Sequence, residues 1–71
     1  MKFSDEEKEI MLRALSILGM ELASDIYYYD ILSYAEADDK AAVERLREAQ
    51  RDAVANRYKA DELYDRIERG E

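Results

Sequence analysis

The sequence contains no cysteine, no histidine, no proline and no tryptophan, and only two glycines. Without cysteine the chain can form neither a disulfide nor a thiolate metal site. Without histidine it lacks the commonest metal ligand and the usual general base. These absences favour a role other than catalysis, and we expect neither an enzymatic activity nor a cofactor.

The chain has 71 residues, which is enough for one small domain. At this length a single hydrophobic core supplies only about 3–5 kcal/mol, so small proteins add disulfides, metals or oligomerisation. Disulfides and thiolate metal sites are already excluded. We therefore expect residues 1–71 to form a single helical domain that is a homo-oligomer, with a dimer favoured.

Acidic residues exceed basic ones, and the net charge is −7. Residues 1–36 hold three basic and eight acidic side chains, a net charge of −5, and residues 37–71 hold eight and ten, a net charge of −2. Binding to nucleic acid depends on lysine and arginine neutralising phosphates. The charge balance argues against direct contact with nucleic acid and, for the same reason, with anionic membrane surfaces.

The most apolar stretch is Ile10–Ala35, in which 18 of 26 residues are apolar or tyrosine. A membrane span needs about 20 consecutive apolar residues. Arg13, Glu21, Asp25 and Asp30 interrupt this stretch, so we do not expect it to cross a membrane. The charged N-terminus also lacks the apolar region of a signal peptide, and a cytoplasmic location is expected.

A first helix is predicted over about residues 4–35. Ser4 and Glu7 match a capping box, in which each side chain binds the backbone N–H of the other residue. Gly19 lies mid-helix, where glycine costs about 1 kcal/mol relative to alanine. Either Gly19 breaks this segment into two helices or it admits a neighbouring backbone at close range; the second interpretation is favoured, because the apolar pattern continues through it.

At 3.6 residues per turn, the first helix shows two apolar stripes about 150° apart. The first stripe comprises Met11, Leu15, Leu18, Leu22, Ile26, Tyr29 and Leu32. The second stripe comprises Leu12, Met20, Ala23, Tyr27, Ile31 and Tyr34. Two stripes require two neighbours, and the rest of the chain can supply only one. The second stripe is therefore the predicted interface.

A turn is predicted over about residues 36–39, with Asp38 or Asp39 capping a second helix over about 39–69. The second helix carries a regular heptad stripe. Its members are Ala42, Leu46, Ala49, Ala53, Asn56, Ala60, Leu63 and Ile67. We call this stripe together with the first stripe of the first helix the intrachain seam. Asn56 either fixes the register of this seam or lies at an exposed end of it, and both interpretations stay open.

The short turn predicts that the two helices run antiparallel. Pairing about the turn places Leu22 near Ala53 and Leu15 near Ala60, so large side chains meet small ones. The fold class is therefore all-α, an antiparallel helical hairpin of two long helices. With the second stripe exposed, two hairpins are expected to assemble into a four-helix bundle.

Two further features could carry function. Glu21 and Asp25 lie one helical turn apart, as in an acid–base or metal site, but we interpret them as an edge pair facing Arg47 or Arg51. The run Tyr27–Tyr29 points in three directions, because successive helical residues are about 100° apart. Tyrosine is enriched at interfaces. We therefore interpret Tyr27 as an interface residue and Tyr29 as part of the seam.

The acidic turn Glu36-Ala37-Asp38-Asp39 and the segment Ala60-Asp61-Glu62-Leu63-Tyr64 resemble the Rop family. Members of that family are small antiparallel helical hairpins that dimerise into a four-helix bundle. The resemblance implies this architecture here. Rop proteins bind RNA through polar and basic residues of their first helix, whereas the first helix of this chain is net acidic.

These observations lead to a hypothesis of function: a small acidic structural or interaction protein. It self-associates through the second stripe and presents helix surfaces to a protein partner. The alternative is a phage-type acidic inhibitor that mimics nucleic acid and blocks a nucleic-acid-binding protein. The alanine-rich, heptad-patterned second helix is also typical of a designed scaffold.

Overall fold

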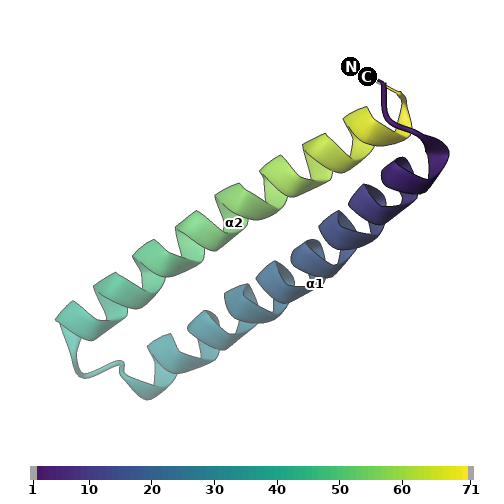
Figure 1. The fold of residues 1–71 in the computed structure, drawn as a ribbon. Helices are drawn as coiled ribbons and strands as arrows, with labels where there is room; N and C mark the ends of the chain where they lie inside the picture. Colours follow the sequence, from purple (N-terminus) through teal and green to yellow (C-terminus); the bar gives the residue numbers. More distant parts are fainter. Residues whose placement is uncertain (1, 71) are drawn as a thin grey trace.

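A computed structural model describes residues 2–70. Within this range the chain forms two α-helices, α1 (Asp5–Ala35) and α2 (Lys40–Glu68), and no strand. The helices lie side by side and antiparallel, with both ends of the chain at one tip and the turn at the other (Figure 1). The predicted all-α helical hairpin is confirmed.

The first turn of α1 has the predicted capping box. The backbone N–H of Ser4 donates to Oε1 of Glu7 at 2.9 Å, and the backbone N–H of Glu7 donates to the Ser4 hydroxyl at 3.1 Å. These bonds satisfy N–H groups that no helical carbonyl can reach. Asp5, Glu6 and Glu7 also place negative charge at the positive end of the helix dipole. Local chemistry thus explains where α1 begins.

Helix α1 runs without a break through Gly19. A Cβ atom built on Gly19 would meet nothing within 4 Å. The prediction that Gly19 admits a neighbouring backbone is therefore wrong within this chain, because no atom of α2 occupies the space beside it. Gly19 leaves a shallow gap in the half-buried surface of the helix.

The turn between the helices is short and hydrogen-bonded. Glu36 caps the end of α1, its backbone N–H donating to the Leu32 carbonyl at 2.9 Å. Asp39, rather than Asp38, caps α2, and its carboxylate accepts from the backbone N–H of Ala42 at 3.1 Å. The backbone N–H of Asp39 also donates to the Glu36 carbonyl at 2.9 Å. Such a tight connection requires α2 to fold straight back along α1.

Two hydrogen bonds fix the register between the helices. The Lys8 ammonium donates to the Glu68 carbonyl at 2.9 Å, and the Gln50 side-chain amide donates to the Ile26 carbonyl at 3.1 Å. Ile26 lies 18 residues after Lys8, and Gln50 lies 18 residues before Glu68. The register is therefore the same at both points, with no skipped residue between them.

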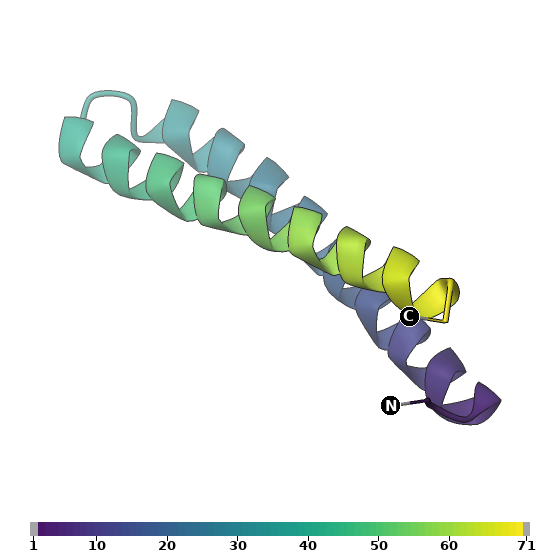
Figure 2. The same cartoon turned by 90° about the horizontal axis from the view of Figure 1, so that it is seen from above.

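The helix axes cross at a shallow angle when viewed at right angles to Figure 1 (Figure 2). The backbone measures 52 × 15 × 12 Å, so the hairpin is a thin rod. Among the described residues only Ala53, Ala60 and Ile67 are buried, and all three belong to α2. Two alanines and one isoleucine make a narrow apolar interior, because two helices alone cannot surround any side chain completely.

Candidate functional site

The largest exposed apolar surface follows α1. Its residues are 49% to 78% exposed and recur with heptad spacing. They are Ile10, Ile17, Met20, Tyr27, Ile31 and Tyr34. Arg13 and Ser24, both exposed, occupy the two remaining heptad positions. We call these eight residues the outward row.

The outward row lies on the side of α1 that faces away from α2. With about 100° between successive residues, its mean direction differs from that of the first stripe by roughly 180°. Helix α2 covers the first stripe and therefore cannot reach the row. The row is the continuous apolar face that the hairpin leaves without a neighbour within the described chain.

The predicted interface residues divide into two groups. Met20, Tyr27, Ile31 and Tyr34 belong to the outward row. Leu12 and Ala23 are half-buried and lie between the row and the seam. Ile10 and Ile17 belong to the row but were not among the predicted interface residues. Their signal is the spacing of Ile10, Ile17 and Ile31, which are separated by multiples of seven.

The intrachain seam residues lie along the contact between the helices, but their burial differs. On α1, Leu15, Leu22, Tyr29 and Leu32 are half-buried and Leu18 is 42% exposed. On α2, the buried residues are Ala53, Ala60 and Ile67, and the half-buried ones are Leu46 and Ala49. Asn56 is exposed and Leu63 is 44% exposed.

Leu18, Asn56 and Leu63 line one shallow hollow at the edge of the seam. Because Asn56 lies in this open hollow, its amide can be hydrated by solvent. A buried asparagine that fixes the register therefore has no counterpart within the single chain, and Gln50 makes the part-buried polar contact instead.

The three consecutive tyrosines separate by direction. Tyr29 is half-buried in the seam, whereas Tyr27 and Tyr28 are exposed. The rings of Tyr28 and Tyr29 lie 6.4 Å apart between centroids with a tilt of 51°. Tyr27 points into the outward row, so an aromatic ring with a water-tolerant hydroxyl stands at the middle of the exposed apolar face.

Glu21 and Asp25 line a shallow hollow beside the outward row, together with Ile17, Met20 and Ser24. Arg47 and Arg51 line a different hollow, on α2. The prediction that the two carboxylates face Arg47 or Arg51 is therefore wrong: they sit on the opposite flank from these arginines. Over residues 2–70, no group of three carboxylates comes close enough together to hold a metal ion.

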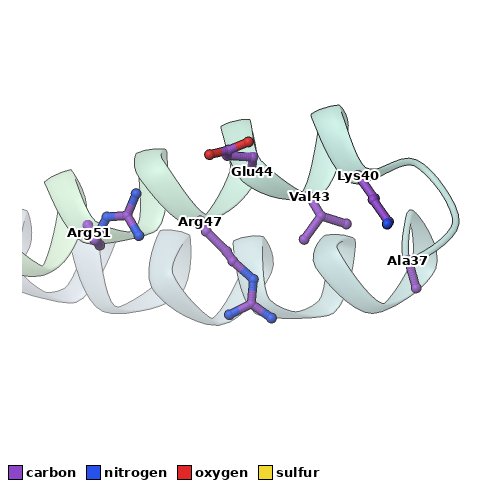
Figure 3. A pocket seen from close by; sticks show the side chains of 6 residues that line it. All are labelled: Ala37, Lys40, Val43, Glu44, Arg47 and Arg51. Atoms are coloured by element: carbon purple, nitrogen blue, oxygen red, sulfur yellow. The ribbon is translucent and has the colours of Figure 1, made fainter.

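A hollow beside the turn carries three basic side chains, Lys40, Arg47 and Arg51, around Val43 (Figure 3). Arg47 extends from α2 over the ribbon of α1, while the Arg51 guanidinium points in another direction. The three cations do not converge on one point. They form a diffuse basic patch on the outer side of α2 rather than a site for a single anion.

In the part of the chain that the structure describes, neither helix combines the length and the apolar character that crossing a membrane requires. Comparisons with protein-family models, with curated proteins and with solved structures find no match.

Proposed function

We propose that this chain is an interaction protein that self-associates through the outward row of α1. Two hairpins then form a four-helix assembly, and the helix surfaces that remain free are presented to a protein partner. The observation that carries this proposal is the exposure of Met20, Tyr27, Ile31 and Tyr34 along one continuous face.

The size of the outward row supports this role. Monomeric proteins seldom expose contiguous apolar patches beyond a few hundred Å², and larger ones mark interaction sites. A tyrosine side chain offers about 150–250 Å², and Tyr27 and Tyr34 are 69% and 78% exposed. These two rings alone approach roughly a third of the ~800 Å² per partner that a stable interface buries.

The thin interior of the hairpin supports it as well. Apolar burial contributes roughly 25 cal/mol per Å², and only two alanines and one isoleucine are buried among the described residues. Covering the outward row adds the burial that one hairpin cannot provide for itself. Association then stabilises the folded state by mass action.

Sedimentation equilibrium at tens of micromolar tests the proposal. The unaltered protein is expected to be a dimer, and Tyr27→Glu is expected to shift it to monomer by placing a charge in the covered face. Tyr58→Glu is the matched control, because Tyr58 is 72% exposed but lies on α2, outside the row. A folded monomer for the unaltered protein, or equal effects of the two variants, would contradict the proposal.

The basic patch of Lys40, Arg47 and Arg51 is the surface we assign to a protein partner, because it lies on the side of α2 that the assembly leaves open. Partner capture from the native host is expected to fall with Arg47→Glu while the dimer persists. Unchanged capture would remove the patch from the proposal and leave self-association standing.

A further inference from the structure

We infer that the occupant of the outward row is a second copy of α1 that runs antiparallel to the first, with the two-fold axis passing near Leu22. This inference rests on the proposed self-association and adds its orientation and register. It is argued from the order of side chains along the row and from the position of its single basic residue.

The outward row is evenly spaced about its midpoint, so reversing it superimposes one row on another. Ile10 then meets Tyr34 of the second copy, and Ile17 meets Tyr27 of the second copy. Near the axis, Met20 meets Ser24 of the second copy. Each tyrosine packs on an isoleucine and the longest aliphatic side chain packs on the smallest residue, which is the alternation that interdigitation requires.

Charge distinguishes this arrangement from a parallel one. Arg13 is the only charged member of the row, and it forms no ion pair within residues 2–70. Reversal places it against Ile31 of the second copy, whose neighbour Asp30 is exposed. Each Arg13 can then pair with Asp30 of the other copy, giving two ion pairs at equivalent positions.

A parallel second copy would place every residue against itself. Arg13 would face Arg13 inside an apolar seam, and like charges in contact are destabilising. Ser24 would face Ser24 and leave a gap, while Tyr27 would meet Tyr27. Repulsion between acids at the ends does not separate the two cases, since Glu6 meets Asp38 in one and Glu6 in the other. Arg13 therefore decides in favour of the antiparallel copy.

The antiparallel copy also determines the shape of the assembly. Because the outward row faces away from α2, the two α1 helices lie at the centre and the two α2 helices lie outside. The four helices form an open layer rather than a bundle with a square cross-section. The basic patches of the two copies then lie at opposite tips of the layer.

Cysteine cross-linking tests the orientation, since the natural chain has no thiol. Chains carrying Ile10→Cys and Tyr34→Cys, distinguished by mass, are mixed and treated with a short bis-maleimide. A covalent dimer between the two variants is expected, with little product from either variant alone, because residues 10 and 34 lie about 36 Å apart along one helix. Circular dichroism confirms that each variant remains helical.

A charge exchange provides a second measurement. Arg13→Glu is expected to weaken dimerisation about tenfold by placing a carboxylate beside Asp30 of the second copy. Adding Asp30→Arg to the same chain is expected to restore most of the affinity. Asp25→Arg, also exposed on α1 but outside the row, is the matched control and should not restore it.

The outcomes separate the inference from the proposed function. A monomer in sedimentation equilibrium overturns both. A dimer in which Ile10→Cys chains cross-link to one another overturns the antiparallel orientation and leaves self-association standing. A dimer that yields no cross-link at any of these positions, or a charge exchange without recovery, also overturns the inference.

Discussion

The side-chain amide of Gln50 donates a hydrogen bond to the backbone carbonyl of Ile26 at 3.1 Å, across the seam in a part-buried position. This contact joins the middle of α1 to the middle of α2. The Ile26 carbonyl lies within a helix, so Gln50 adds a second donor to a carbonyl that has two lone pairs. Its effect is to fix the sliding position of the two helices.

Replacing Gln50 with alanine is expected to lower the free energy of unfolding by roughly 1 kcal/mol, because a part-buried hydrogen bond is lost. Urea denaturation followed by circular dichroism measures the change. Asn56→Ala is the matched control: Asn56 is exposed, so its loss is expected to leave stability unchanged or slightly raised, since alanine is the better helix former. Equal destabilisation by both variants would contradict a role for Gln50 in fixing the register.

The capping box gives a prediction about pH. Hydrogen bonds from the backbone and the hydroxyl of Ser4 hold the pKa of the Glu7 carboxyl below its ordinary value of 4.5. A carboxyl with a lowered pKa contributes stability that is complete above the ordinary pKa and is lost as pH falls through the folded-state pKa. The unaltered protein is therefore expected to lose more stability than Glu7→Gln between about pH 5 and pH 3.

Thermal denaturation across this pH range measures the difference. Ser4→Ala is expected to cost about 1 kcal/mol at neutral pH and to flatten the pH dependence as well. Ser24→Ala, a serine in the interior of α1 and away from its cap, serves as the control for removing a hydroxyl. Parallel pH profiles for the unaltered protein and Glu7→Gln would refute the capping explanation.

The two glycines are expected to respond to alanine in opposite directions. Gly19→Ala should raise the free energy of unfolding by about 1 kcal/mol, because the added methyl meets nothing within 4 Å and alanine favours the helix. Gly70→Ala should lower it, because Gly70 has φ of +83°, a conformation that costs other residues about 1 kcal/mol. Chemical denaturation compares the two variants. A loss of stability on Gly19→Ala would show that another chain approaches this position.

Ionic strength separates self-association from mimicry of nucleic acid. The net charge of −7 makes two copies repel one another, so dimerisation is expected to strengthen or stay constant as salt rises from about 0.05 M to about 0.5 M. Capture of a basic protein through carboxylates would instead collapse over this range. Sedimentation equilibrium measures the first, and a binding titration with the captured partner measures the second.

Local signals in the sequence were sufficient for the helix ends. Ser4 and Glu7 act within one turn, and Asp39 acts on Ala42 three residues later, so neither depends on distant packing. The choice between Asp38 and Asp39 needed coordinates, because both residues precede the helix and can accept the same N–H. The hairpin itself followed from the short turn and the heptad stripe of α2.

The outward row was harder to predict for a geometric reason. On a straight helix of 3.6 residues per turn, a strict seven-residue repeat drifts by about 20° per heptad. Ile10 and Tyr34 therefore fall in different directions on such a projection, and Leu12 and Ala23 fall closer to the row than they are. Lys8 and Gln50 were missed because polar residues that bind a backbone carbonyl have no periodic signal.

Both tips of the rod differ in their connections, and this has a consequence for engineering the chain. At one tip the Lys8–Glu68 hydrogen bond holds the beginning and end of the hairpin together, and at the other the exposed loop of residues 36–39 is the sole link. A circular permutant that joins the natural termini through a short glycine-rich tether and opens the chain at Ala37 keeps every helix-to-helix contact intact. The new termini would then emerge beside the basic patch.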